Sequence, residues 1–253
     1  MHYNLKNKTA LITGSSRGIG KAIAILFAQN GARLAIHYNN NREKAENTLK
    51  ELEGEDHMII QADLSDEKSP EMMTKKVISV FGNIDILVNN AGIYEEHPFV
   101  KSEFKEWKDR WKHTIDVNLL APANLSFCVA KFMEENGGGR IINITSRGAF
   151  RGEPDAPAYG ASKAGMNAMS QSMAKALAPL NIFVFAIAPG FVETDMATEF
   201  LEGPDGDFIK NQSPLKRVAK PEEVACTAAF LASDGTDFLT GGVIDVNGAS
   251  YLR

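Results

Sequence analysis

Short β-branched or apolar runs alternate with longer segments of helical periodicity along the whole chain. The apolar runs occupy residues 9–13, 33–37, 58–61, 84–89, 140–145, 182–187 and 243–246. The helical segments occupy residues 18–30, 42–53, 70–81, 101–131, 158–178 and 222–232. Strands that alternate with helices are typical of βαβ units, in which parallel strands are covered on both faces. The pattern predicts a single α/β domain over residues 1–253, with a doubly wound (Rossmann-like) seven-stranded parallel sheet and helices on both faces.

Only the segment 193–220 combines considerable length with no clear periodicity. It contains Gly203, Pro204, Gly206 and Pro214. An irregular segment of this length in a compact domain is usually a lid or a binding loop. We therefore expect a flexible loop that borders the substrate.

Composition and charge narrow the functional classes. The formal net charge of −5 predicts no surface suited to nucleic acid or to an anionic membrane. No stretch approaches the roughly 20 apolar residues that span a bilayer, and the run at 9–13 is too short for a secretion signal. Cys128 and Cys226 lie in apolar helical segments, so we expect two buried free thiols, with no disulfide and no metal site. The default compartment is the cytoplasm.

A glycine-rich turn follows the first predicted strand. The residues from Thr13 to Gly20 read TGSSRGIG, with glycines in the spacing G-x-x-x-G-x-G, and a helix follows. Glycines allow bare backbone to approach a pyrophosphate, and the helix N-terminus supplies free N–H groups and a partial positive charge. An ordinary turn between a strand and a helix would give the same pattern, so the turn alone is weak support for a dinucleotide site.

The end of the second predicted strand indicates which dinucleotide would bind. Sites selective for NAD usually place Asp or Glu there to bind the ribose 2′-hydroxyl. Residues 36–42 read IHYNNNR and contain no acid, so a 2′-phosphate would not be repelled. Arg17 and Arg42 could pair with that phosphate, although Arg42 could equally be a solvated helix charge. The sequence favours NADP(H) over NAD(H).

Tyr159 and Lys163 are the strongest candidates for the chemistry. They lie four residues apart near the start of a helix, so both side chains can reach one cleft. A nearby ammonium lowers the pKa of a phenol, which could then exchange a proton with a carbonyl oxygen. Ser146 lies at the carboxyl end of a strand, where ligands bind in open α/β sheets. Asn118 is a mid-helix asparagine, which is costly unless its amide has a role.

These motifs, taken in order, resemble those of the short-chain dehydrogenase/reductases over essentially the whole chain. The matches are the Thr13–Gly20 turn, Asp63-Leu64, Asn89-Asn90-Ala91-Gly92, Asn118, Ser146, Tyr159 with Lys163, Pro189-Gly190 with Thr194, and Thr240-Gly241-Gly242. The resemblance implies hydride transfer between a nicotinamide cofactor and a small carbonyl or alcohol substrate. It also implies a homotetramer in which the long helices containing Asn118 and Tyr159 pack between subunits.

The resemblance also assigns roles residue by residue. Tyr159 would be the catalytic acid/base, and Lys163 would lower its pKa and bind the nicotinamide ribose. Ser146 would orient the carbonyl, and Asn118 would hold a water in a proton relay to Lys163. The residues implied in cofactor binding are Gly14, Ser16, Arg17, Gly18, Ile19, Gly20, Tyr38, Asn39, Asp63, Leu64, Asn90, Ala91, Gly92, Tyr159, Lys163, Pro189, Gly190, Val192 and Thr194.

Within that family the chain resembles most closely the 3-oxoacyl-acyl-carrier-protein reductases, with three departures. Gly137 and Leu180 stand where such enzymes tend to place basic residues, so an acidic carrier protein would find little electrostatic steering. The segment between Asn90 and Asn118 is about one helical turn longer. Phe185 replaces a usual Asn and puts the local loop geometry in doubt.

Three hypotheses follow from these observations. The leading one is an NADPH-dependent carbonyl reductase for which a carrier protein is a doubtful partner. The second is a sugar or polyol dehydrogenase that uses the same residues in the oxidative direction. The third, from another class, is a non-catalytic module that senses NADP(H), although none of its catalytic residues is lost.

Overall fold

The structure is a computed structural model that describes residues 3–253, and its centre is one parallel sheet. The strands are β1 (Thr9–Ile12), β2 (Arg33–Tyr38), β3 (Met58–Gln61), β4 (Ile86–Asn89), β5 (Gly139–Ile144), β6 (Ile182–Pro189) and β7 (Val243–Val246). They pair in parallel in the order β3-β2-β1-β4-β5-β6-β7. The predicted fold class is confirmed. No helix in this part of the chain is long and apolar enough to cross a membrane.

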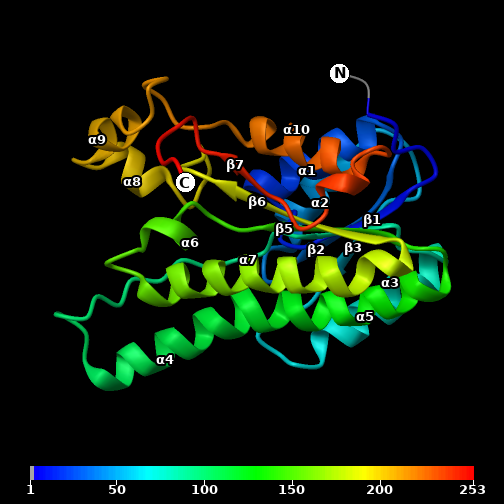
Figure 1. The fold of residues 1–253 in the computed structure, drawn as a ribbon, viewed down its shortest axis with the longest axis horizontal. Coiled ribbons are helices and arrows are strands. Elements are labelled where there is room, and N and C mark those ends of the chain that lie inside the picture. Colours follow the sequence, from blue (N-terminus) through cyan, green and yellow to red (C-terminus); the bar gives the residue numbers. More distant parts are fainter. Residues whose placement is uncertain (1–2) are drawn as a thin grey trace.

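Two layers of helices cover the sheet (Figure 1). One layer contains α1 (Gly18–Gln29), α2 (Arg42–Lys50) and α10 (Pro221–Ala232), and the other contains α3 (Ser69–Phe81), α5 (Ala121–Glu135) and α7 (Pro157–Leu177). Because strands between two helical layers are buried on both faces, they are apolar nearly throughout, and all four residues of β4 are buried. Phe185 belongs to one of the two resulting cores and is fully buried in β6, so this departure from the family pattern affects core packing.

The strand order reverses between β1 and β4. From β1 the chain proceeds outward to β2 and β3, and then returns to the other side of β1. Such a switch point leaves a crevice at the carboxyl ends of the two strands, where ligands bind in open α/β sheets. A Cβ on Gly14, just after β1, would lie 2.9 Å from the Cα of Ala91, just after β4. The two strand ends therefore meet closely, and only bare backbone fits at Gly14.

The predicted helix over 101–131 is divided in the structure. It consists of α4 (Phe104–Ile115), a π-helical turn η1 (Asp116–Leu120) and α5. The π turn contains Asn118. π turns are rare and often occur at functional sites. The apolar periodicity of the sequence does not reveal this interruption, because all three segments are helical.

The segment 193–220 is more regular than the sequence predicts. It contains two short helices, α8 (Thr198–Glu202) and α9 (Gly206–Asn211), and it rejoins the body through a bridge between Val192 and Ala219. Helices of five and six residues give too few turns for a periodic signal. The other short helical pieces are α6 (Gly148–Arg151), η2 (Ala178–Leu180) and η3 (Asp237–Leu239).

The prediction of two buried thiols is wrong. Both cysteines are free, but Cys128 is only half-buried and Cys226 is exposed. Each lies on a helix that packs one face against the sheet, and an apolar neighbourhood in sequence does not say which face a residue occupies.

A buried polar network joins the two central strands to the helices α5 and α7. The Asn89 amide donates to Ser126 Oγ at 2.9 Å and to Asn143 Oδ1 at 2.8 Å. The Asn143 amide in turn donates to Ser170 Oγ at 2.8 Å. Satisfied networks of this kind specify a unique packing, and a missing member leaves buried groups unpaired.

We expect Asn89→Ala to lower the free energy of unfolding by about 1–3 kcal/mol, because it leaves Asn143 Oδ1 without its donor. Urea denaturation of the variant and the wild type measures the difference. Ser172→Ala is the control, because its hydroxyl bonds only to Ala168 O on the exposed side of the same helix as Ser170. Equal losses in the two variants would contradict the role of the network.

Candidate active site

The glycine turn packs against the end of β4. Gly14 and Gly18 have φ angles of 62° and 54°, in the left-handed region that favours glycine. A Cβ on Gly20 would lie 2.4 Å from Gly14 O and 2.5 Å from Asn90 Nδ2, so no side chain fits there. The Asn90 amide donates to Thr13 O at 2.9 Å and to Gly14 O at 3.0 Å. Asn90 thus holds the turn, and the first N–H groups of α1, which follows it, have no partner within the helix.

His37 also supports the turn, and sequence reasoning missed it. Its Nδ1 accepts a hydrogen bond from the Gly14 N–H at 3.0 Å, so its Nε2 carries the proton and donates to Ala62 O at 3.0 Å. The imidazole is buried, and burial lowers its pKa, which keeps it neutral. A polar residue in an otherwise apolar predicted strand was the only available signal.

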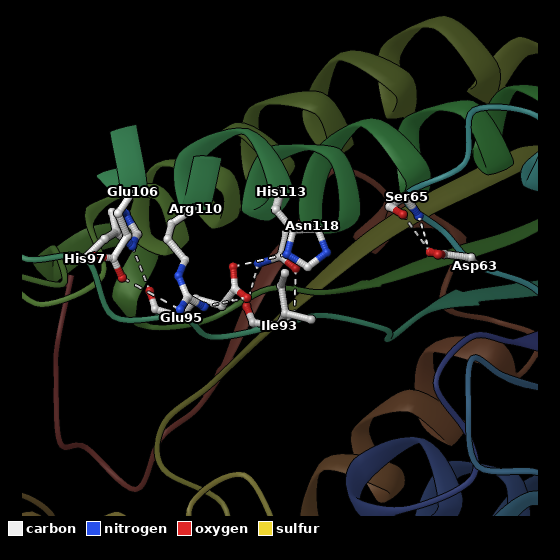
Figure 2. Close-up of polar contacts among 9 residues, drawn as sticks. All are labelled: Asp63, Ser65, Ile93, Glu95, His97, Glu106, Arg110, His113 and Asn118. Atoms are coloured by element: carbon white, nitrogen blue, oxygen red, sulfur yellow. Dashed lines mark hydrogen bonds and ion pairs between the residues drawn. The ribbon is translucent and has the colours of Figure 1, made fainter. Parts of the chain in front are cut away.

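The residues expected around the adenosine lie at the ends of β2 and β3. Tyr38 is buried and Asn39 is exposed, and the Ala62 N–H donates to Tyr38 O at 3.1 Å. Asp63 is exposed and accepts hydrogen bonds from Ser65 N and Oγ at 2.9 and 2.8 Å, which lower the pKa of its carboxyl. Leu64 is buried. Figure 2 shows Asp63 and Ser65 apart from the cluster around Asn118.

Cations gather beside the turn, but not the pair that the sequence suggested. Arg42 is exposed and its Nε donates to Glu46 at 2.7 Å along its own helix. Lys44 instead lies close to Arg17, because both donate to the same Asp195 oxygen, at 2.7 and 3.4 Å. Asp195 follows Thr194, and Thr194 Cγ2 would lie 3.2 Å from a Cβ on Gly18. The segment after β6 therefore reaches the glycine turn, as the cofactor assignment requires.

The other residues of that segment lie where the chain leaves the sheet. Pro189 ends β6, and its carbonyl accepts the Arg147 N–H at 2.9 Å. A Cβ on Gly190 would lie 3.1 Å from the Cα of Asn247, so the backbone passes close to the end of β7. Val192 is buried.

Ser146, Tyr159 and Lys163 come together at the carboxyl end of β5. The Ser146 side chain lies close enough to the Tyr159 phenol to act on its pKa, which it lowers, against the larger opposite effect of burial. Lys163 Nζ lies 5.8 Å from the centre of the Tyr159 ring and donates to Ile144 O at 2.9 Å. The four-residue spacing on α7 thus brings phenol and ammonium to one face, as the sequence predicts.

Burial dominates the protonation of this pair. It raises the pKa of Tyr159, and it lowers the pKa of Lys163 to about 8. The expectation that the ammonium lowers the phenol pKa is therefore wrong for the folded protein. Removal from water disfavours the charged form of each group, which raises the pKa of the phenol and lowers that of the ammonium. A neutral phenol is the form that can give a proton to a carbonyl oxygen.

The lowered pKa of Lys163 has a consequence for stability. Below pH 8 the buried ammonium costs stability, and the cost disappears as pH rises from about 8 toward the ordinary lysine value, where the folded state has already lost its proton. We expect Lys163→Met to raise the free energy of unfolding at pH 7 by about 1–2 kcal/mol, after the lost bond to Ile144 O is counted. Denaturant unfolding at pH 7 and pH 10 should show this gap narrowing at the higher pH. Lys175→Met, an exposed position on the same helix, should show no such change.

Asn118 is locked to the loop that follows β4. Its Oδ1 accepts the Ile93 N–H at 2.8 Å and its Nδ2 donates to Ile93 O at 2.9 Å (Figure 2). The Nδ2 also donates to Ser162 Oγ at 3.3 Å. A Cβ on Gly92 would lie 3.3 Å from Asn118 Oδ1 and 3.4 Å from Lys163 Nζ, so both groups border the same bare stretch of backbone. The side chain thereby fixes the π turn beside the active site.

The loop from 93 to 99 also braces the helix that carries Tyr159. The buried His97 donates from Nδ1 to Glu95 O at 2.8 Å and accepts the Ala158 N–H on Nε2 at 3.1 Å. The Glu95 carboxylate binds Arg110 at 3.0 Å and His113 at 3.2 Å, both on α4 (Figure 2). The lengthened segment between Asn90 and Asn118 therefore contacts, through His97, the residue directly before Tyr159.

The described residues fit a bound dinucleotide. Side chains are excluded at Gly14 and Gly20, the N-terminus of α1 opens beside them, and Arg17 and Lys44 add positive charge. The Ser146 hydroxyl and the Tyr159 phenol are neighbours at the end of β5, where the substrate carbonyl would be held.

Comparisons with known proteins agree with this geometry. A family model described as enoyl-(acyl carrier protein) reductase matches residues 14–249. The 3-oxoacyl-(acyl-carrier-protein) reductase FabG of Staphylococcus epidermidis is 39% identical over 248 residues, which cover 97% of this chain and 100% of that protein. The FabG of Thermotoga maritima is 39% identical over 252 residues, 98% of this chain and 99% of its own. The chain belongs to the short-chain dehydrogenase/reductase family.

A solved short-chain dehydrogenase/reductase-like structure extends the likeness to three dimensions. A protein of Agrobacterium tumefaciens, provisionally assigned as a gluconate dehydrogenase, superposes with a TM-score of 0.91 at 32% identity and covers 99% of this chain and 98% of its own. As a member of the short-chain dehydrogenase/reductase family, the protein is an NAD(P)H-dependent oxidoreductase. Of the three hypotheses, the non-catalytic sensing module is thereby disfavoured.

Proposed function

We propose that the protein is an NADP(H)-dependent reductase that converts a ketone, such as a 3-oxoacyl group, into a secondary alcohol, with Tyr159 as the acid/base. The observation that carries the proposal is the convergence of Ser146, Tyr159 and Lys163 at one strand end. The absence of an acid at the end of β2, together with Arg17 and Lys44 beside the turn, supports NADP(H).

Each side chain has a defined task in this reaction. The Ser146 and Tyr159 hydroxyl groups hold the carbonyl oxygen, and Tyr159 gives it a proton. Lys163 stabilises the phenolate that remains and binds the ribose of the cofactor, while Asn118 supports a water relay that restores the proton. NADP(H), when bound at the glycine turn, supplies the hydride. Oxidation of an alcohol uses the same groups in reverse.

The test is oxidation of NADPH, and in parallel of NADH, in the presence of a panel of ketones that includes a 3-oxoacyl thioester. We expect turnover with at least one ketone and a higher kcat/KM with NADPH. Failure of the whole panel with both cofactors would contradict ketone reduction.

A polyol or sugar-acid dehydrogenase is the second candidate, favoured by the structural similarity to the Agrobacterium protein. It differs in direction and substrate but not in catalytic groups. Assays with NADP+ and gluconate or simple polyols separate the two, because a polyol dehydrogenase would oxidise these and leave the thioester unreduced.

The assembly and the partners follow from the family resemblance. We propose a cytoplasmic homotetramer that packs through the helices containing Asn118 and Tyr159. A carrier protein remains a doubtful partner, because Gly137 and the partly exposed Leu180 offer no positive charge to an acidic surface. Sedimentation of the purified protein tests the tetramer.

A further inference from the structure

A carboxylate outside the assigned catalytic set lies against the backbone beside the two residues that would hold the substrate oxygen. Glu153 occupies the loop between α6 and α7. A Cβ on Gly148 would lie 2.5 Å from Glu153 Oε1, so the carboxylate rests on the backbone of Gly148, whose N–H donates to Ser146 Oγ at 3.0 Å. A Cβ on Gly160, next to Tyr159, would lie 3.5 Å from Glu153 N and 3.9 Å from Glu153 Cβ.

The Glu153 carboxylate has no hydrogen-bond or ion-pair partner among residues 3–253. The charges of Arg151 and Arg147 act on the carboxylate and lower its pKa, against the larger opposite effect of burial, but the donors of both guanidinium groups are directed elsewhere. Arg147 donates to Ser250 Oγ and to Gln212 Oε1, each at 2.6 Å, and Arg151 donates to Gln212 Oε1 at 3.3 Å. Glu153 is half-buried, and burial raises the pKa of its carboxyl. A half-buried carboxylate without donors is costly, and a donor from a bound molecule would remove that cost.

The surroundings limit the size and polarity of such a molecule. The Tyr94 ring lies edge-on to the Tyr159 ring at 5.2 Å, and Phe200 of α8 packs edge-on to Tyr94 at 5.8 Å. Burial raises the pKa of the Tyr94 phenol, and the charge of Glu153 adds to that effect. The space beside Tyr159 is thus bordered by aromatic rings on one side and by an acceptor-only carboxylate on another.

We propose that Glu153 accepts a hydrogen bond from a hydroxyl group next to the substrate carbonyl, so that the enzyme acts on hydroxylated ketones. The proposal rests on the ketone reduction proposed above and names its substrate class. An unsubstituted acyl chain brings no donor to this position, and it leaves the carboxylate desolvated and unpaired.

The experiment compares pairs of ketones that differ by a hydroxyl in place of a methyl group. Hydroxyacetone is paired with 2-butanone, and 3-hydroxy-2-butanone with 3-methyl-2-butanone. In the wild type we expect kcat/KM to be higher for the hydroxylated member by about tenfold or more. Glu153→Leu should remove this preference by lowering the hydroxylated member alone. Glu153→Gln, which keeps an acceptor oxygen, should retain part of it.

Asp155→Asn is the matched control, because this exposed carboxylate on the same loop should leave the preference unchanged. Equal loss for both members of a pair in Glu153→Leu would overturn the proposal, as would a wild-type preference for the methyl member. A higher kcat/KM for aminoacetone than for hydroxyacetone would overturn the choice of a hydroxyl group as the donor to Glu153.

Binding measurements keep this proposal separate from the catalytic one. Titration of the Tyr159→Phe protein with NADPH bound, followed by cofactor fluorescence, reports ketone affinity without turnover. Tighter binding of the hydroxylated member that Glu153→Leu abolishes supports the role of Glu153, even if no ketone is reduced. Equal binding of both members overturns it, whatever the turnover.

Discussion

Replacement of Tyr159 by Phe is expected to reduce ketone turnover by about two to four orders of magnitude, while NADPH still binds. The variant loses only the hydroxyl group. That hydroxyl lies beside Ser146, and burial raises its pKa and so favours the neutral form that can donate a proton. Without it the alkoxide that develops on the carbonyl oxygen loses the acid assigned to protonate it, although Ser146 can still hydrogen-bond the oxygen. Stopped-flow and steady-state measurements of kcat, with cofactor affinity determined in parallel, check the result.

Tyr251→Phe is the control for loss of a phenol hydroxyl, since Tyr251 is neither one of the expected catalytic residues nor one of the expected cofactor contacts. We expect its kcat to match the wild type. Retention of more than about a tenth of the activity in Tyr159→Phe would contradict the acid/base role. A loss confined to KM would instead indicate that the hydroxyl only binds the substrate.

Much of this site could be predicted from local sequence, because its parts are local. Tyr159 and Lys163 share a helical face through a spacing of four, and Ser146 follows a strand whose end must lie at the crevice. The fold could be predicted for the same reason, since alternating apolar runs and helical periods record which faces each element buries.

The remaining features depend on contacts between distant parts of the chain. Lys44 donates to Asp195, which lies 151 positions away in the sequence. The hydrogen bond from Gly14 N–H to His37 can form only once β1 and β2 have paired. Periodicity cannot reveal such pairings. From the sequence, Arg42 is the expected second cation because it follows the second strand, whereas the contact that brings Lys44 beside Arg17 forms only in the fold.

The pKa shifts of Tyr159 and Lys163 could not be predicted from the sequence, for a physical reason. Proximity of Tyr159 and Lys163 can be inferred from spacing, but the degree of burial cannot. The folded environment removes both groups from water, and this desolvation outweighs their mutual effect. A site that binds a negatively charged cofactor next to Lys163 would restore its ammonium form, which would connect cofactor binding with the protonation of the Tyr159–Lys163 pair.

The double variant Arg17→Ala with Lys44→Ala is expected to weaken NADPH binding by about tenfold to a hundredfold and to leave NADH binding nearly unchanged. Both cations point at one carboxylate oxygen of Asp195, at 3.4 and 2.7 Å, so their donors already converge on a single anionic position beside the turn. A 2′-phosphate offers the same kind of acceptor with more charge. Fluorescence titration with each cofactor, at low and at moderate salt, measures the ratio of the two affinities.

A substitution at Asp195 should have the opposite effect on NADPH affinity. Because Asp195 competes for the same two cations, Asp195→Asn should tighten NADPH binding, whereas removal of the cations loosens it. Arg42→Ala is the control, since that guanidinium is exposed and occupied by Glu46, and it should shift neither affinity. Equal weakening of NADPH and NADH in the double variant would show that Arg17 and Lys44 support the fold of the turn and do not read the 2′-phosphate. In that case the preference for NADP(H) would rest only on the missing acid at the end of β2.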